Sequence, residues 1–97
     1  MTKIPESILS MPDAAAVVCM HDLVMRAVED LHALCERDSG ISQTAEFDAA
    51  TAAFKRYENV MLALVADPKE VTRLTVLQCG DVVLKACAAA MPKTKGN

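Results

Sequence analysis

Apolar residues recur at helical spacing through the first third of the chain. They fall within about 120° of one another on a helical projection, whereas the opposite side is charged. Ser10 followed by Pro12 is typical of a helix start, and Ser39-Gly40 suits a C-terminal cap. We therefore predict a helix that stops near Asp38. Its apolar stripe consists of Val17, Met20, Val24, Ala27, Val28, Leu31, Leu34 and Cys35.

A second helix is predicted from residues 42–44 to about Ala66. Ser42 to Thr44 can cap its N-terminus. Both phenylalanines and the single tyrosine of the chain belong to this segment, so it should supply the bulkiest part of the core. The expected apolar stripe is Phe47, Ala50, Phe54, Tyr57, Met61, Leu64 and Val65.

The third predicted helix begins with a strong local signal. Asp67 as N-cap, Pro68 at the first helical position and Glu70 at the third would form a capping box. The helix should end near Met91, before Pro92. Its apolar arc spans about 160°, so more than one neighbour must cover it. The arc consists of Val76, Leu77, Cys79, Val83, Leu84, Cys87, Ala90 and Met91, opposite a polar stripe of Gln78, Asp81 and Lys85 in which Asp81 and Lys85 can pair.

An alternative for residues 71–87 is a β-hairpin. Val71 to Val83 is rich in β-branched residues, and Cys79-Gly80-Asp81 could form the turn. Neither arm alternates cleanly between apolar and polar residues. The helical interpretation is therefore favoured, with the hairpin as the alternative.

Together these elements predict an all-α fold, an antiparallel three-helix bundle in which residues 1–97 form one helical domain. Residues 1–11 should form an N-terminal arm with a short turn of helix carrying Ile4, Ile8 and Leu9. This arm could cover the open side of the bundle or pack on a second protomer. Residues 92–97 should form a flexible tail.

Composition narrows the class of protein. Hydrophobic residues make up 53% of the chain, but there are only two Phe, one Tyr and no Trp, so the core must be aliphatic. No apolar run has the roughly 18 residues that a membrane span requires, and charges and prolines interrupt any signal peptide. The four cysteines contain no C-x-x-C spacing, which favours buried reduced thiols. We expect a soluble cytoplasmic protein that does not bind membranes.

Charge is distributed unevenly along the chain. Residues 1–54 contain nine acids and three bases, whereas residues 55–97 contain four acids and seven bases. The two halves could face each other within the fold or across a dimer. The acidic side of the first helix could instead be an ordinary solvated surface or a surface that docks on a basic partner. The residues predicted to bind such a partner are Asp22, Glu29, Asp30, Glu36 and Asp38.

The sequence contains no pattern typical of an enzyme, a metal centre or a bound cofactor. Cys19 and His21 point to opposite sides of one helix, so they cannot form a catalytic dyad there. His32 and Cys35 could provide two metal ligands, but a soft site needs two more, so we predict no metal. Direct nucleic-acid binding is also not expected, because the chain has no exposed aromatic platform.

The leading functional hypothesis is a small non-enzymatic module that binds a larger protein. In its most specific form, it is an inhibitor that docks its acidic helix on a host complex that handles nucleic acid. This hypothesis rests on an analogy of size, fold and charge with phage-encoded anti-CRISPR proteins. The alternatives are a structural or regulatory homodimer and, with less support, a metal or redox sensor. The predicted dimer contact consists of Val18, Met25, Val76, Val83 and Cys87.

Overall fold

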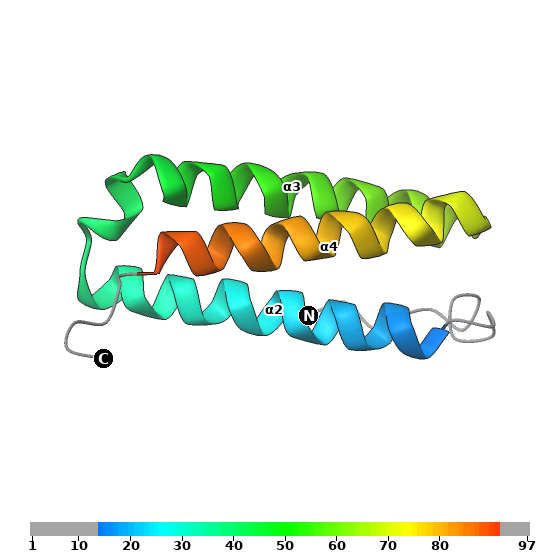
Figure 1. The fold of residues 1–97 in the computed structure, drawn as a ribbon, viewed down its shortest axis with the longest axis horizontal. Helices are drawn as coiled ribbons and strands as arrows, with labels where there is room; N and C mark the ends of the chain where they lie inside the picture. The colour runs from blue at the N-terminus through cyan, green and yellow to red at the C-terminus, as the bar shows by residue number, and fades with distance from the viewer. Residues whose placement is uncertain (1–13, 92–97) are drawn as a thin grey trace.

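The fold is a bundle of three helices. The structure is a computed structural model that describes residues 14–91. Helix α2 spans Ala14–Arg37, the short 3-10 helix η1 spans Ile41–Gln43, α3 spans Ala45–Ala66 and α4 spans Glu70–Ala90. Successive helices are antiparallel, and α4 lies between α2 and α3 in Figure 1. The predicted all-α bundle is therefore confirmed, whereas the arm at residues 1–11, the start of the first helix and the tail at 92–97 lie outside the described residues.

Residues 71–87 are helical, so the hairpin alternative is wrong. Helix α4 continues through Gly80 without a break. It packs closely against both α2 and α3, as its wide apolar arc requires. On the solvent side, Lys85 Nζ lies 2.9 Å from Asp81 Oδ2, which confirms the predicted pair. The hydrogen bond to Asp81 raises the pKa of Lys85.

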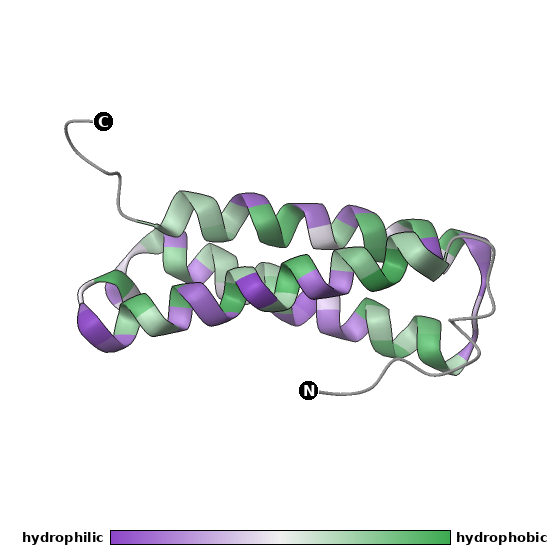
Figure 2. Cartoon of the chain, turned by 90° about the horizontal axis from the view of Figure 1, so that it is seen from below, coloured by the Kyte–Doolittle hydropathy of each residue, from purple (hydrophilic) through white to green (hydrophobic). Residues whose placement is uncertain are grey.

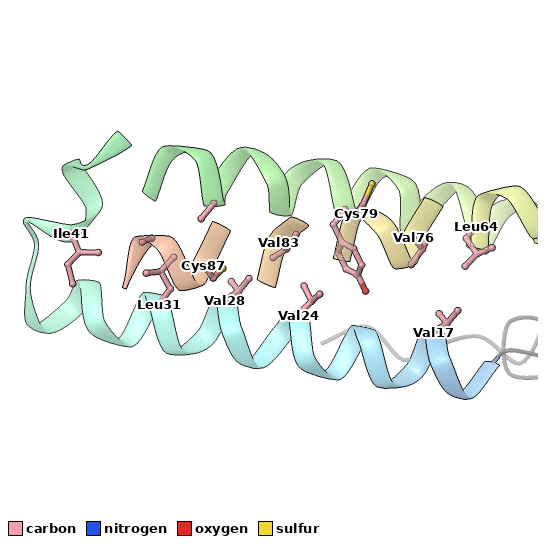
Figure 3. Close-up of a cluster of buried hydrophobic side chains, with 13 residues drawn as sticks. Val17, Val24, Val28, Leu31, Ile41, Leu64, Val76, Cys79, Val83 and Cys87 are labelled. Atoms are coloured by element: carbon pink, nitrogen blue, oxygen red, sulfur yellow. The ribbon is translucent and has the colours of Figure 1, made fainter. Parts of the chain in front are cut away.

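The core is a continuous row of small and medium-sized apolar side chains between the three helices (Figure 3). Tyr57 is its one buried aromatic ring among the described residues and is 1% exposed. The stripes predicted for the first and second helices face inward, except that Val65 is 37% exposed. The fully buried or nearly buried apolar residues are Val17, Val24, Val28, Leu31, Ile41, Ala50, Tyr57, Leu64, Val76, Cys79, Val83, Cys87 and Ala90.

The connection between α2 and α3 is only partly as expected. Thr44 is the N-cap of α3, and its hydroxyl oxygen accepts a hydrogen bond from the amide of Phe47 at 3.1 Å, as predicted. Gly40, however, does not form a left-handed C-terminal cap, because its φ of −63° is right-handed. Its amide donates to Asp38 Oδ1 at 3.0 Å, and the chain continues directly into η1, where Ile41 is buried.

The capping box predicted at the start of the third helix is wrong. Asp67 is the C-cap of α3, and its amide donates to the carbonyl of Ala63 at 3.0 Å. Helix α4 begins two residues after Pro68, with Lys69 as an N-cap that makes no side-chain capping bond. The physical reason is that reversal between antiparallel helices needs several extended residues, and proline disfavours a helical conformation in the residue before it.

Candidate functional site

The five predicted partner-binding residues are all exposed. Asp22, Glu29, Asp30 and Glu36 lie on the outer side of α2, and Asp38 follows its end. Asp22 forms an i,i+4 pair with Arg26 at 3.6 Å, but both side chains are more than 60% exposed, so the pair contributes little stability. In Figure 2, hydrophilic residues alternate with hydrophobic ones along each helix, as expected for amphipathic helices.

The structure divides these acids between two sides of α2. Asp22, Glu29 and Glu36 are spaced seven residues apart, so they follow nearly one line along the helix. Asp30 lies on another side because one residue turns the helix by about 100°. In residues 14–91, Glu29, Asp30 and Glu36 have no ion-pair partner. These carboxylates are therefore available to an external cation.

More acidic residues lie where α2 joins α3. Glu46 and Asp48 occupy the first turn of α3, where negative charge favours the positive end of the helix dipole. Both are exposed, as are Glu36 and Asp38 near the end of α2. This end of the bundle thus extends the acidic surface of α2 onto the next helix.

The sequence pattern did not predict the hydrogen bond that joins α2 to α3. His21 Nδ1 lies 2.9 Å from the hydroxyl of Tyr57, and the two rings are nearly parallel with centroids 6.0 Å apart. A buried tyrosine hydroxyl requires a hydrogen-bond partner. That requirement and the position of His21 at the edge of the apolar stripe both suggest such a bond in the sequence. Neither feature identifies the two residues as partners, because they are 36 positions apart.

Burial controls the titration of this pair. It raises the pKa of Tyr57 far above its ordinary value, so the phenol stays protonated. Burial also lowers the pKa of His21, an effect partly opposed by the charge of Asp22. The neutral imidazole is therefore the form that the folded protein favours.

We expect acid to destabilise the fold through His21. A lowered folded-state pKa means that the unfolded state binds more protons as the pH falls below about 6.5. The His21 contribution to stability is therefore complete above that pH, and it is lost as the pH falls through the folded-state pKa. Urea denaturation between about pH 7.5 and pH 5.5 measures this slope.

Two histidine variants separate this effect from general acid sensitivity. His21→Gln should flatten the pH dependence of the unfolding free energy, whereas His32→Gln, which changes an exposed histidine on the same helix, should leave it intact. An unchanged slope in His21→Gln would show that other groups cause the acid sensitivity.

His32, Cys35 and the other thiols are not grouped into a metal site in the described residues. Residues 14–91 contain no group of three or more His, Cys, Asp or Glu side chains placed to hold a metal ion. All four cysteines are free, with Cys19 exposed, Cys35 half-buried and Cys79 and Cys87 buried. Burial raises the pKa of Cys87, so this thiol is a poor nucleophile.

The predicted dimer contact conflicts with the burial of its three α4 residues. Val76 and Val83 are 0% exposed and Cys87 is 2% exposed, because the wide apolar arc of α4 is covered by α2 and α3 of the same chain. In this structure these three side chains offer almost no surface to a second protomer. Val18, at 36% exposed, and the half-buried Met25 remain accessible on α2.

No family profile, curated protein or solved structure matches the chain. Among the described residues, no helix is both long enough and apolar enough to cross a membrane. The surface chemistry of the bundle is therefore the basis for assigning a function.

Proposed function

We propose that the protein is a small non-enzymatic module that binds a larger protein through the acidic outer side of α2. The observation that carries this proposal is the exposure of Asp22, Glu29, Asp30, Glu36 and Asp38 on and just after one helix, where only Asp22 has an ion-pair partner in residues 14–91. A rigid helix presents these carboxylates at fixed spacing. Such a surface complements a basic groove that ordinarily accepts phosphates.

More specifically, the protein would be an inhibitor of a host complex that handles nucleic acid. Phage-encoded anti-CRISPR proteins are the analogous class in size, fold and charge. A basic nucleic-acid channel must be electrostatically attractive to polyanions, so a folded acidic helix can compete for it. A cytoplasmic location belongs to the same proposal, and the four free cysteines support it.

Charge reversal on α2 tests the proposal. The variant Glu29→Lys/Asp30→Lys/Glu36→Lys should weaken partner binding by at least about 100-fold, because like charges at an interface cost several kcal/mol. The measurement is affinity capture of host proteins on the full-length chain, followed by titration of the recovered partner. The partner should bind nucleic acid and release it when the native chain is added. Higher salt should also weaken the contact.

A matched variant controls for net charge. Asp67→Lys/Glu70→Lys/Asp81→Lys makes the same change in net charge outside α2 and should retain binding. Circular dichroism must show that both variants remain helical. Equal binding by the α2 variant and the native chain would reject the electrostatic docking surface.

The second candidate function is a structural or regulatory homodimer. The exposed Val18 and half-buried Met25 favour it, since both are apolar and lie on one side of α2. Light scattering distinguishes the two functions, because the dimer should have about twice the mass of a single chain. A mass that stays at 10.4 kDa at high protein concentration would exclude it.

A further inference from the structure

One side of α2 faces α3 only partly and remains open to solvent. His21 points toward α3, where it bonds to Tyr57, whereas Met20 lies toward Gly80 of α4. Val18 and Met25 stand three residues before and four residues after His21, so they share the side of α2 that faces α3. Glu29 follows Met25 by four residues and lies where this side meets the outer side of α2.

Helix α3 contributes the matching half of this surface. Phe54 stacks next to Tyr57, with ring centroids 6.4 Å apart, and is only half-buried. Glu58 and Met61 follow Phe54 at four and seven residues, so all three lie on one side of α3. Because α2 and α3 approach each other less closely than either approaches α4, this side is not closed by packing within residues 14–91. We call the combined surface the α2–α3 face, defined by Val18, Met25, Glu29, Phe54, Glu58 and Met61.

The α2–α3 face combines apolar and acidic groups in a definite order. The antiparallel pairing of His21 with Tyr57 places Val18 near the Glu58–Met61 end and Glu29 at the other end. Met25 and Phe54 therefore lie between the two carboxylates. From Val18 to Glu29 the surface runs about 16 Å along α2, which is three turns of helix.

We propose that the α2–α3 face binds a basic amphipathic helix of a partner protein. A helix that fits this face needs apolar side chains at i, i+3, i+4 and i+7 against Met25 and Phe54, flanked by Lys or Arg opposite Glu29 and Glu58. Methionine on such a surface adapts to different side chains. This inference rests on the proposed function and specifies the chemistry of the partner for the same side of the bundle.

The negative charge of the α2–α3 face favours a basic helix over a second copy of the chain. Two copies joined through this face bring further carboxylates close together, since Asp22 and Glu36 lie beside it on α2. Like charges in contact are unfavourable. A cationic helix instead pairs with Glu29, which has no ion-pair partner in the described part of the chain.

The experiment uses fluorescent synthetic peptides and the full-length chain. The probe is a helix of about 18 residues with leucines on one side and lysines on the other. A scrambled peptide of the same composition keeps the charge but loses the apolar side. Fluorescence anisotropy should show that the amphipathic probe binds at least about tenfold more tightly than the scrambled one. Equal affinities would overturn the proposal, because charge alone would then explain the binding.

Variants test whether the peptide probe binds at the α2–α3 face. Glu29→Lys/Glu58→Lys should weaken probe binding by at least about tenfold, and Met25→Gln should weaken it with no change in net charge. Glu70→Lys, on α4, should leave it unchanged. Loss of affinity in Glu70→Lys equal to that in the α2–α3 variants would overturn the assignment. So would light scattering showing that the native chain is a dimer that the probe does not dissociate.

The two proposals fail in distinguishable ways. If host-protein capture depends on Glu29, Asp30 and Glu36 but the amphipathic probe binds no better than the scrambled one, the helix inference is wrong and the proposed function stands. If the probe binds as expected but no captured protein responds to those three reversals, the α2–α3 face is supported and the proposed function is wrong.

Discussion

Replacing Tyr57 with alanine is expected to lower the free energy of unfolding by about 3 to 5 kcal/mol, the range for removing a buried aromatic side chain. Tyr57 is 1% exposed, packs beside Phe54 and reaches Gly80 with its ring edge. The variant leaves a cavity in the centre of the bundle and removes the hydrogen bond to His21. A small domain has only about 5 to 15 kcal/mol of stability. Urea denaturation followed by circular dichroism measures the loss.

Two further variants interpret this loss: one separates the Tyr57 ring from its hydroxyl, and the other is a control at an exposed position. Tyr57→Phe keeps the ring and removes the hydroxyl, so it should cost only about 1 kcal/mol, the usual net worth of one hydrogen bond. Leu62→Ala on the exposed side of α3 should change stability by less than about 0.5 kcal/mol. If Tyr57→Ala were as mild as Leu62→Ala, Tyr57 would not be the central core residue that the structure describes.

Replacing Gly80 with leucine is expected to cost about 2 to 3 kcal/mol through overpacking. A Cβ at Gly80 would lie 2.5 Å from Met20 Cγ, 2.6 Å from Met20 Sδ and 3.4 Å from the Tyr57 ring, so any side chain at this position requires Met20 to move. The same urea measurement gives the loss. Ala89→Leu adds similar volume at an exposed position of α4 and should have little effect.

The alanine variant tests whether Met20 causes the conflict. Alanine is more favourable than glycine in a helix by about 1 kcal/mol, but in Gly80→Ala the displacement of Met20 should cancel that gain. In a Met20→Ala background, Gly80→Ala should become stabilising by about 1 kcal/mol. An effect of Gly80→Ala that is the same in both backgrounds would refute the contact.

Much of the fold was predictable because an amphipathic stripe is encoded locally. The first-helix stripe from Val17 to Cys35 and the Thr44 cap were predicted from spacing and side-chain chemistry between nearby residues. The exposure of the acids on α2 follows from the same spacing, because the polar side of a helix faces solvent.

The structure differs from the sequence predictions where local chemistry allows two outcomes. Asp67, Pro68 and Glu70 have the residue types of a capping box, but the closing turn of α3 uses the Asp67 amide, and the reversal into α4 delays the helix start. Likewise, an apolar arc too wide for one neighbouring helix to cover predicts a second neighbour. The pattern does not show whether that neighbour belongs to the same chain or to another copy. In the structure, α2 and α3 cover Val76, Val83 and Cys87.

Local spacing along the chain is enough to specify three helices, the apolar side of each and the line of acids on the first. Which apolar sides pack together, and which remain open to solvent, depends on the three-dimensional arrangement of the helices. This arrangement pairs His21 with Tyr57, places Met20 against Gly80 and leaves Val18, Met25 and Phe54 incompletely covered. The physical reason is that helical periodicity depends on residues a few positions apart, whereas packing depends on side-chain shape between residues distant in sequence.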